Sequence, residues 1–315
     1  FVQMNTTGFI DLHSDTIMVC NREKLDFINP KTHISLDKVT PGTRWAQTYA
    51  IFVPDEKRGQ DAVDYYRECV RYFCGQLEKY SGKLSQVRNA ADVDNAFEAG
   101  KFAGILAVEG GAALAGRMEM IEELAKDGVR FLTLTWNGPN EIGSGSVTHN
   151  GLSDFGREAI AEMERKNIIV DVSHLNDEGF ADLCKIASKP FIATHSNSRA
   201  ICGHSRNLTD AQFCEIRDRG GIVGLNYYRN FIVDGGETTS ISDLLKHVHH
   251  FLELGGENTI ALGSDFDGAD IPGYLDSVEK VDNLYDALLA DGLGKELAEK
   301  ILFGNAYNFI RNNLK

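Results

Sequence analysis

Residues 168–174 read IIVDVSH, a run of apolar and mostly β-branched residues that ends in a histidine. A strand covered on both faces is continuously apolar, whereas a strand with one solvated face alternates between apolar and polar residues. The run Ile168–Ser173 therefore predicts a buried strand of a parallel sheet, with His174 at its carboxyl end.

Similar apolar runs recur along the chain, and segments of helical periodicity separate many of them. The expected strands are Phe9–His13, Ala46–Val53, Phe102–Val108, Phe131–Thr135, Ile168–Ser173, Phe191–Thr194, Ile222–Asn226 and Thr259–Ser264. The expected helices between them include Asp61–Lys79, Met118–Lys126, Ser153–Lys166, Asn176–Ala187, Thr209–Arg219 and Ile241–Leu254. This alternation is typical of α/β proteins with helical crossovers, and eight strands predict a single (β/α)8 barrel of the TIM type.

One domain, residues 1–315, accounts for the whole chain. The sequence contains no low-complexity linker or composition shift, and its length is within the range of a single α/β barrel. After the eighth strand we expect C-terminal helices, at about 277–313, that close the outer ring: Ser277–Leu289, Lys295–Leu302 and Asn305–Asn312. The longest irregular stretches are 21–44 and 137–152, and long loops in a compact fold are often functional.

Charge and cysteine content exclude several classes of function. The net charge is −14, from 46 acidic and 32 basic residues, which disfavours nucleic acid and anionic membranes as partners. No apolar run is long enough for a transmembrane segment, and the six cysteines form no CxxC pair, as expected in a reducing compartment. Residues 1–7 lack the features of a secretory signal, so we expect a cytoplasmic protein, although a leader removed before Phe1 would leave no trace.

Polar side chains stand at the carboxyl ends of the predicted strands. In chain order they are His13, Asp15, Glu109, His174, His195 and Asp265. In an α/β barrel these ends converge on one mouth, where the active site lies. Imidazoles and carboxylates are ligands of first-row divalent metals, and three histidines with two carboxylates can hold two ions. The sequence therefore predicts a metal-dependent hydrolase with a two-metal site.

The arrangement of these residues suits hydrolytic chemistry. His13 and Asp15 are two residues apart on an extended strand, so their side chains share a face. Glu109 offers two oxygens that can bridge two ions, and such a pair of ions can share a hydroxide of lowered pKa. Asp265 can take and return the proton of that nucleophile. A single histidine at a strand end is more often a packing or surface residue, so the metal site is favoured by the whole set.

The motifs that carry these residues resemble the membrane dipeptidase, or renal dipeptidase, family of zinc peptidases, bacterial members included. The resemblance covers nearly the whole chain, in the blocks FIDLHSDT, AVEGG, FLTLTWN, GLSDFG, VDVSHLND, THSNSRAICGHSRNLTD, GSDFDG and ILFGNAYNF. It implies a dipeptidase that hydrolyses the amide bond of dipeptides by a metal-bridging hydroxide. It further implies that His13 and Asp15 hold one zinc ion, that His174 and His195 hold the other, and that Glu109 bridges them.

The resemblance also assigns residues to the substrate. It implies that Asp265 is the acid/base residue and that Arg206 engages the substrate carboxylate, for which a planar bidentate donor is suited. The alternative for Arg206 is an ion pair that caps the next helix. A homodimer is common among relatives, so a second copy of the chain is a possible partner beside the dipeptide.

The chain departs from the family pattern at Trp136. Well-known mammalian members have a histidine at this position, assigned to the substrate in the tetrahedral intermediate. An indole donates one hydrogen bond but does not titrate, so the departure predicts a shift in substrate preference. His149 in the following loop, or Asn137, can supply the missing contact, and we expect Tyr228 and Asn226 to line the pocket.

Two other functions compete with the dipeptidase. Another two-metal barrel hydrolase would act on lactones, cyclic amides or phosphotriesters, and many of these use a carboxylated lysine at the end of the fourth strand. Here the fourth predicted strand ends at Trp136, and the bridging candidate is Glu109 on the third. A non-catalytic metal or peptide binder would lack a ligand or Asp265, and none of these is missing. The other six histidines are weaker candidates, and His247, His249 and His250, which lie in an amphipathic helical segment, are expected to form a solvated or rim-packed face.

Overall fold

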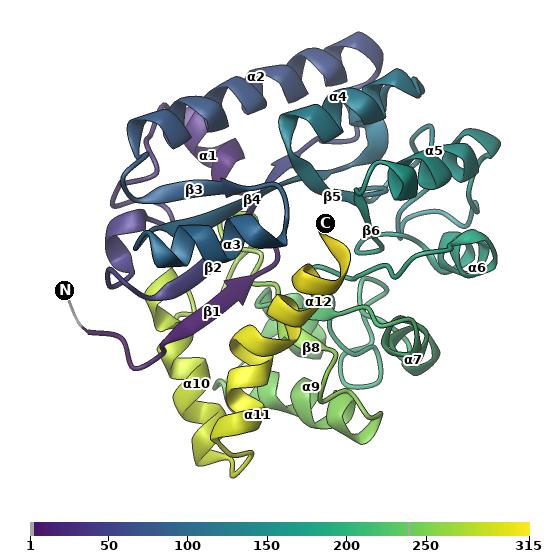
Figure 1. Cartoon of the computed structure of the whole chain (residues 1–315). Helices are drawn as coiled ribbons and strands as arrows, with labels where there is room; N and C mark the ends of the chain where they lie inside the picture. The colour runs from purple at the N-terminus through teal and green to yellow at the C-terminus, as the bar shows by residue number, and fades with distance from the viewer. Residues whose placement is uncertain (1–2, 239) are drawn as a thin grey trace.

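A computed structural model of the chain describes residues 3–238 and 240–315 (Figure 1). Phe1, Val2 and Thr239, which belong to the predicted domain 1–315, lie outside the described residues. The strands are β1 (Gly8–Asp11), β2 (Arg44–Phe52), β3 (Leu84–Val87), β4 (Phe102–Glu109), β5 (Val129–Thr133), β6 (Ile169–Asp171), β7 (Val223–Leu225) and β8 (Ile260–Leu262). The helices are α1 (Thr16–Glu23), α2 (Gly59–Lys79), α3 (Ala90–Glu98), α4 (Glu119–Asp127), α5 (Asp154–Arg165), α6 (Asp177–Ile186), α7 (Asp210–Asp218), α8 (Arg229–Ile232), α9 (Ser242–Glu253), α10 (Val281–Ala290), α11 (Lys295–Glu299) and α12 (Asn305–Asn313).

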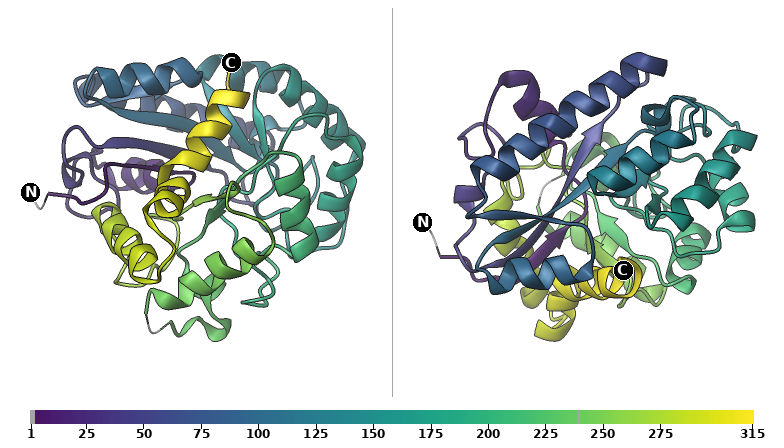
Figure 2. Two further views of the ribbon diagram at one scale, coloured as in Figure 1. Left: turned by 60° about the horizontal axis from the view of Figure 1, so that its bottom comes forward. Right: turned by 45° about the horizontal axis from the view of Figure 1, so that its top comes forward.

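The strands form one parallel sheet, in the order β6-β5-β4-β2-β1-β8-β7, with β3 paired to β4 off this path. The register pairs Phe9 of β1 with Trp45 of β2, and Val223 of β7 with Ile260 of β8. Figure 2 shows the strands in the middle of the molecule and the helices around them. The α/β class and the parallel sheet are therefore confirmed, and the sheet curves as a half-barrel.

Two segments differ from the predicted strands. Residues 191–194 make only isolated bridges, from Ile192 to Asp171 and from Ala193 to Val223, and therefore lie between β6 and β7 without a regular ladder. The preceding Pro190 has no backbone N–H to extend the pairing. Strand β3 was not expected, because its sequence LSQV has no apolar run; it pairs along one side with β4.

The core has two layers, which explains why the strands are apolar on both faces. In β1, Phe9 packs with the outer helices, whereas the next residue, Ile10, belongs to a second cluster inside the curve of the sheet. Phe309 and Ile310 of α12 join this inner cluster, and Figure 1 shows α12 crossing in front of the strands. Helix α12 therefore covers the inner cluster.

The predicted helices that start at Ser153 and Thr209 agree with the structure, in which these two residues are N-caps. The Ser153 side chain accepts a hydrogen bond from the backbone N–H of Gly156, and Thr209 caps α7 in the same way. Gly128 ends α4 with a φ of 92°, a left-handed conformation that glycine adopts without strain. No helix of the described residues is both long and apolar enough to cross a membrane.

Candidate metal centre

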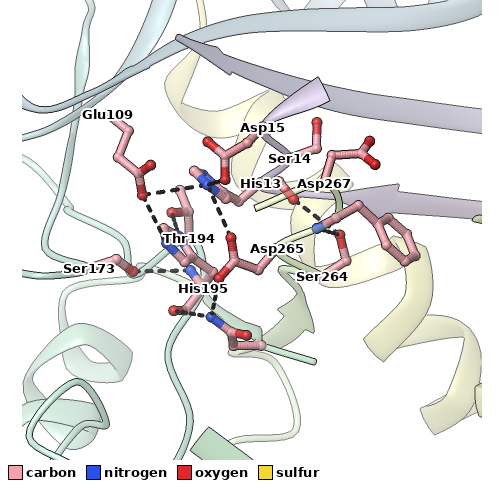
Figure 3. Close-up of polar contacts among 12 residues, drawn as sticks. His13, Ser14, Asp15, Glu109, Ser173, Thr194, His195, Ser264, Asp265 and Asp267 are labelled. Carbon is pink, nitrogen blue, oxygen red and sulfur yellow. Dashed lines mark hydrogen bonds and ion pairs between the residues drawn. The ribbon is translucent and has the colours of Figure 1, made fainter. Parts of the chain in front are cut away.

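The structure brings the predicted ligands together where the strands end. Figure 3 shows His13, Glu109 and His195 pointing toward one another. The Oε2 atom of Glu109 lies 3.0 Å from His174 Nε2, 3.1 Å from His195 Nε2 and 3.5 Å from His13 Nε2. All four side chains are buried. One carboxylate oxygen therefore faces three imidazole nitrogens, and all four side chains are largely shielded from water.

Two aspartates complete the cluster. Asp15 Oδ2 and Asp265 Oδ1 lie 3.3 and 3.6 Å from His13 Nε2. Within the described residues, two groups are close enough to hold an ion: His13 with Glu109 and His195, and His13 with Asp15 and Asp265. The Oδ1 atom of Asp15 is buried and has no hydrogen-bond partner among the described residues. A buried carboxylate oxygen without a donor is costly, so a cation fits this cluster.

Neighbouring side chains fix which nitrogen of each histidine faces the cluster. The Thr194 hydroxyl donates to Asp171 Oδ2 at 2.6 Å, so it accepts from His195 Nδ1, which lies 2.7 Å away. The Asn137 amide oxygen accepts from His174 Nδ1 at 2.9 Å. Because both Nδ1 atoms carry the proton, both Nε2 atoms present a lone pair to the cluster, as metal-binding histidines require.

The electrostatics of the cluster also suit a cation. Burial raises the pKa of Glu109 to about 7 and that of Asp15 to about 6. Burial also lowers the pKa of His174 and His195 well below the usual value, so these imidazoles are neutral. For His13, burial acts in the same direction, but Glu109 and Asp15 outweigh it and raise the pKa well above the usual value. Positive charge at this place stabilises the carboxylates, and neutral imidazole is the form that binds metals.

Unusual backbone conformations surround the cluster. His174 and Asp265 have φ values of 73° and 65°, in the left-handed region that residues other than glycine rarely occupy. Such conformations cost on the order of 1–3 kcal/mol each and gather at functional sites. A Cβ atom on Gly268 would meet Asp15 Oδ2 at 1.8 Å. Glycine at position 268 therefore allows the chain to pass close to the candidate ligand Asp15.

A cavity of about 420 Å³ adjoins the cluster, and Arg206, Tyr228 and Asn137 are among the residues that line it. The Arg206 side chain is buried; Nη2 donates to the backbone oxygen of His195 at 3.0 Å, and Nη1 contacts Ser196 Oγ at 3.2 Å. Its Nε atom has no hydrogen-bond partner, and no carboxylate lies within 4.0 Å of the guanidinium, in the described part of the chain. Arg206 is therefore not paired to a helix end and remains available to an anion.

A second cavity, of about 220 Å³, adjoins the same cluster. Asp15, Met18, Phe52 and Glu109 line this cavity alone, and both cavities share Trp136, His174, Asp265 and Gly268. The Trp136 ring meets the Phe52 ring edge-on, with 4.9 Å between centroids. The candidate ligands therefore adjoin two neighbouring cavities: the larger is lined by Arg206, and the smaller has Met18 and Phe52 in its wall beside the carboxylates.

Two histidines lie elsewhere than the sequence suggested. His149 does not reach either cavity: its side chain is 90% exposed, and Nδ1 lies 3.2 Å from Glu178 Oε1 at the surface. His247 is fully buried, which corrects the expectation of a solvated or rim-packed face. Its Nδ1 accepts from the backbone N–H of Ser198, and its Nε2 donates to the Ile232 carbonyl. The apolar face of α9 is wide enough to include it.

The sequence analysis did not identify Asp171, whose buried carboxylate contacts the segments that carry His174 and His195. Its Oδ1 atom accepts from the backbone N–H groups of Ser173 and Thr194, and its Oδ2 atom accepts from the hydroxyls of Thr133 and Thr194. The carboxylate thereby joins β5, β6 and the segment 191–194. The signal was the acidic residue inside the apolar run IIVDV, because a buried carboxylate needs several partners.

Comparison with known proteins identifies the family. The family described as membrane dipeptidase, peptidase family M19, matches residues 3–313. The chain belongs to the membrane dipeptidase family. A protein of Klebsiella pneumoniae, described as an uncharacterized protein in the pqqA 5′ region, is 32% identical over 243 residues, which are 74% of this chain and 90% of that protein. Membership in this family confirms the predicted activity: the chain is a metal-dependent dipeptidase, a hydrolase of peptide bonds.

Solved structures agree with this membrane dipeptidase assignment. A metallopeptidase from Rhodobacter sphaeroides, liganded with a phosphinate mimic of the dipeptide L-Ala-D-Ala, superposes with a TM-score of 0.93 at 27% identity, over 98% of this chain and 100% of that one. The dipeptidase AC of family M19 gives a TM-score of 0.93 at 28% identity, over 98% and 99% of the two chains. An amidohydrolase from Pseudomonas aeruginosa shares the fold, with a TM-score of 0.79 at 21% identity over 99% and 96% of the two chains. The architecture is therefore that of the TIM-barrel-like metallohydrolases.

Proposed function

We propose that this dipeptidase binds two divalent ions, zinc in the native enzyme. His13 and Asp15 would hold one ion, His174 and His195 would hold the other, and Glu109 would be shared by both. The observation that carries the proposal is the position of Glu109 Oε2, at 3.0, 3.1 and 3.5 Å from three imidazole Nε2 atoms. The buried Asp15 Oδ1 atom, which lacks a donor among the described residues, supports the same donor set.

The proposal extends to the closure of the sheet. Residues 191–194 act as the strand between β6 and β7. The eight strands of a (β/α)8 barrel are then this segment together with β1, β2, β4, β5, β6, β7 and β8. The bridges of Ile192 and Ala193 to the two neighbouring strands support this closure. In a closed barrel, His195 emerges at the same mouth as His13 and His174, as a shared ion site requires.

The substrate is a dipeptide whose carboxylate binds Arg206. A buried guanidinium that lacks a carboxylate partner among the described residues favours an anion, and charge-assisted bonds are strong in a site shielded from water. The larger cavity, of about 420 Å³, is within the size range of small-molecule sites. The Rhodobacter sphaeroides relative was crystallised with a mimic of L-Ala-D-Ala, which supports extending the substrates of this chain to a D-residue at the second position. Tyr228 forms part of the wall around that residue.

The residues of the chain then divide the chemistry. Bound divalent ions polarise a carbonyl oxygen and lower the pKa of water. Asp265 takes a proton from the attacking water and delivers it to the leaving amine, so that one water is consumed and a carboxylic acid and an amine are formed. Asn226 Nδ2, 3.2 Å from Asp265 Oδ2, orients the carboxylate. Asn137 orients His174 through Nδ1, while Trp136 supplies an apolar wall at the position of the family histidine.

The variant Asp265→Asn tests the acid/base role. Asparagine keeps the shape of the side chain but cannot carry the proton, so we expect turnover of dipeptides to fall by about 10²- to 10⁴-fold. The ion content, measured by elemental analysis, should stay at that of the unmodified enzyme. Asp270→Asn is the matched control, because Asp270 is an exposed carboxylate paired with Arg229, and it should leave both quantities unchanged. Full turnover in Asp265→Asn contradicts the acid/base role, and loss of an ion would make Asp265 a ligand instead.

A further inference from the structure

The turn that carries Asp265 holds a second, differently oriented carboxylate. Residues 264–268 read SDFDG and follow β8, and both Asp265 and Asp267 are in the left-handed region, with φ values of 65° and 66°. Figure 3 shows the Asp265 carboxylate beside His13 and the Asp267 carboxylate on the other side of the turn. Two such residues separated by one position are uncommon, so contacts elsewhere in the molecule must hold this turn.

Asp267 makes those contacts with His33. The Asp267 side chain is buried, and Oδ1 accepts from the backbone N–H of His33 at 2.6 Å. In return, the backbone N–H of Asp267 donates to His33 Nδ1 at 2.8 Å. The two residues are 234 positions apart in the chain. This reciprocal pair of hydrogen bonds joins the turn to the long loop between α1 and β2. No residue of that loop has been assigned to the metal centre or to the substrate.

The same carboxylate reaches the start of α1. Asp267 Oδ2 accepts from Thr16 Oγ1 at 2.7 Å, and Thr16 directly follows the candidate ligand Asp15. The backbone N–H of Asp15 in turn donates to the Phe266 carbonyl at 2.8 Å, and the His33 carbonyl accepts from Val278. The turn, the first residues of α1 and the loop around His33 are therefore tied to one another at the edge of the cluster.

We infer that Asp267 and His33 are positioning residues of the peptidase reaction, which hold the turn 264–268 so that Asp265 stays beside His13. The inference rests on the proposed role of Asp265. Asp267 does not take that role itself, because its oxygens are occupied by His33 and Thr16 on the far side of the turn. His33 acts at a distance: it touches the backbone of the turn and packs on Phe266, with 5.6 Å between ring centroids.

The variants His33→Ala and His33→Asn form a matched pair. Alanine removes the acceptor for the Asp267 N–H, whereas asparagine can place its amide oxygen near the position of Nδ1. A displacement of about 1 Å at a reacting group can cost about 100-fold in rate, so we expect His33→Ala to lower kcat by about 10- to 100-fold. KM, ion content and the thermal unfolding temperature should change little, and His33→Asn should recover most of kcat. Equal losses in both variants, or no loss in either, would overturn the inference.

A double variant separates this inference from the role of Asp265. If His33 acts only through Asp265, adding His33→Ala to Asp265→Asn causes no further loss of kcat. An additive loss means that His33 acts through another route and overturns the inference while Asp265 keeps its role. Full activity in Asp265→Asn alone refutes the proposed acid/base role instead. If His33→Ala does not fold, Thr16→Val replaces it, because it removes the other donor to Asp267 without changing the shape of the side chain. Its effect on kcat is then compared alone and in combination with Asp265→Asn.

Discussion

The Thr194 hydroxyl lies between Asp171 Oδ2 and His195 Nδ1, at 2.6 and 2.7 Å. Because this contact fixes the proton on Nδ1, we expect Thr194→Val to weaken metal binding, since the loss of such a partner costs about 10- to 100-fold in affinity. The zinc affinity is measured by competition with a chromophoric chelator. The unmodified enzyme and the Thr194→Val variant are compared at a temperature where both are folded.

The matched control for Thr194 is Thr135→Val. Thr135 is buried as well, but its hydroxyl has no hydrogen-bond partner in the described part of the chain. The same substitution there should leave the zinc affinity unchanged. An equal loss of affinity in the two variants would show that a buried valine perturbs the fold in general, and that Thr194 has no particular effect on His195.

His247 gives a prediction about stability and pH. Burial lowers its pKa to about 4 in the folded chain, against about 6.5 when unfolded. Between pH 6.5 and pH 4, His247 is protonated in the unfolded state but still neutral in the folded state. The stability contributed by neutral His247 is therefore complete above pH 6.5 and is lost as the pH falls toward 4. At 1.36 kcal/mol per pKa unit, the loss is about 3 kcal/mol. Chemical unfolding of His247→Gln across this range should show a correspondingly flatter pH dependence than that of the unmodified protein, and an equally steep dependence in the variant would contradict the role of His247.

The sequence predicted the candidate metal ligands but not the side chains that contact and orient them. The candidate ligands were found because each follows an apolar strand, so one rule of topology located them all. Asp171, Thr194 and His247 are defined by partners that lie far away in the chain, such as Thr133 or Ile232. The acidic residue inside the apolar run IIVDV marks Asp171 as a side chain that needs partners, but residue type and local period do not say which partners it has, so these contacts could not be predicted.

At the scale of elements, α12 is the piece that covers the inner cluster. Phe309 is buried there with Ile10 and Ile105 of the strands. We expect Phe309→Ala to lower the free energy of unfolding by about 3–5 kcal/mol, as the removal of a buried phenylalanine does, and denaturant titration measures it. Leu289→Ala in α10, at an exposed position, should change it by no more than about 0.5 kcal/mol. A similar small effect of Phe309→Ala would mean that α12 does not stabilise the inner cluster.

The elements also show how far periodicity predicts a fold. Strand β4 is buried along its whole length, and a continuous apolar run in the sequence predicts such a strand. Strand β3 has the polar residues Ser85 and Gln86 between two apolar ones and lies against the first half of β4, so its pairing, and not its composition, makes it a strand. The segment 191–194 is the reverse case, since its apolar residues predicted a strand but only isolated bridges form. Local pattern therefore predicted burial, whereas hydrogen-bond register depended on the rest of the chain.

At the scale of the molecule, the proposed contact of Arg206 with the substrate carboxylate predicts that the dipeptide is divided between the two cavities. Arg206 belongs to the larger cavity alone, so a dipeptide that binds it by the carboxylate directs its first residue toward the smaller cavity of about 220 Å³. Met18, Phe52 and Trp136 form apolar walls there. Size and polarity then favour a small apolar side chain at the first position, while the second position faces the roomier cavity beside Tyr228.

Phe52→Ala tests this division, because Phe52 lines the smaller cavity only. Removing the ring should raise kcat/KM for Phe-Ala relative to Ala-Ala by about tenfold, the scale on which pocket size discriminates between side chains. The ratio for Ala-Phe relative to Ala-Ala should stay constant, since Phe52 does not touch the larger cavity. Val147→Ala, at an exposed position on the rim of the larger cavity, is the control that leaves first-residue preference unchanged. If Phe52→Ala altered the Ala-Phe ratio instead, the dipeptide would bind in the opposite direction and its carboxylate could not be held by Arg206.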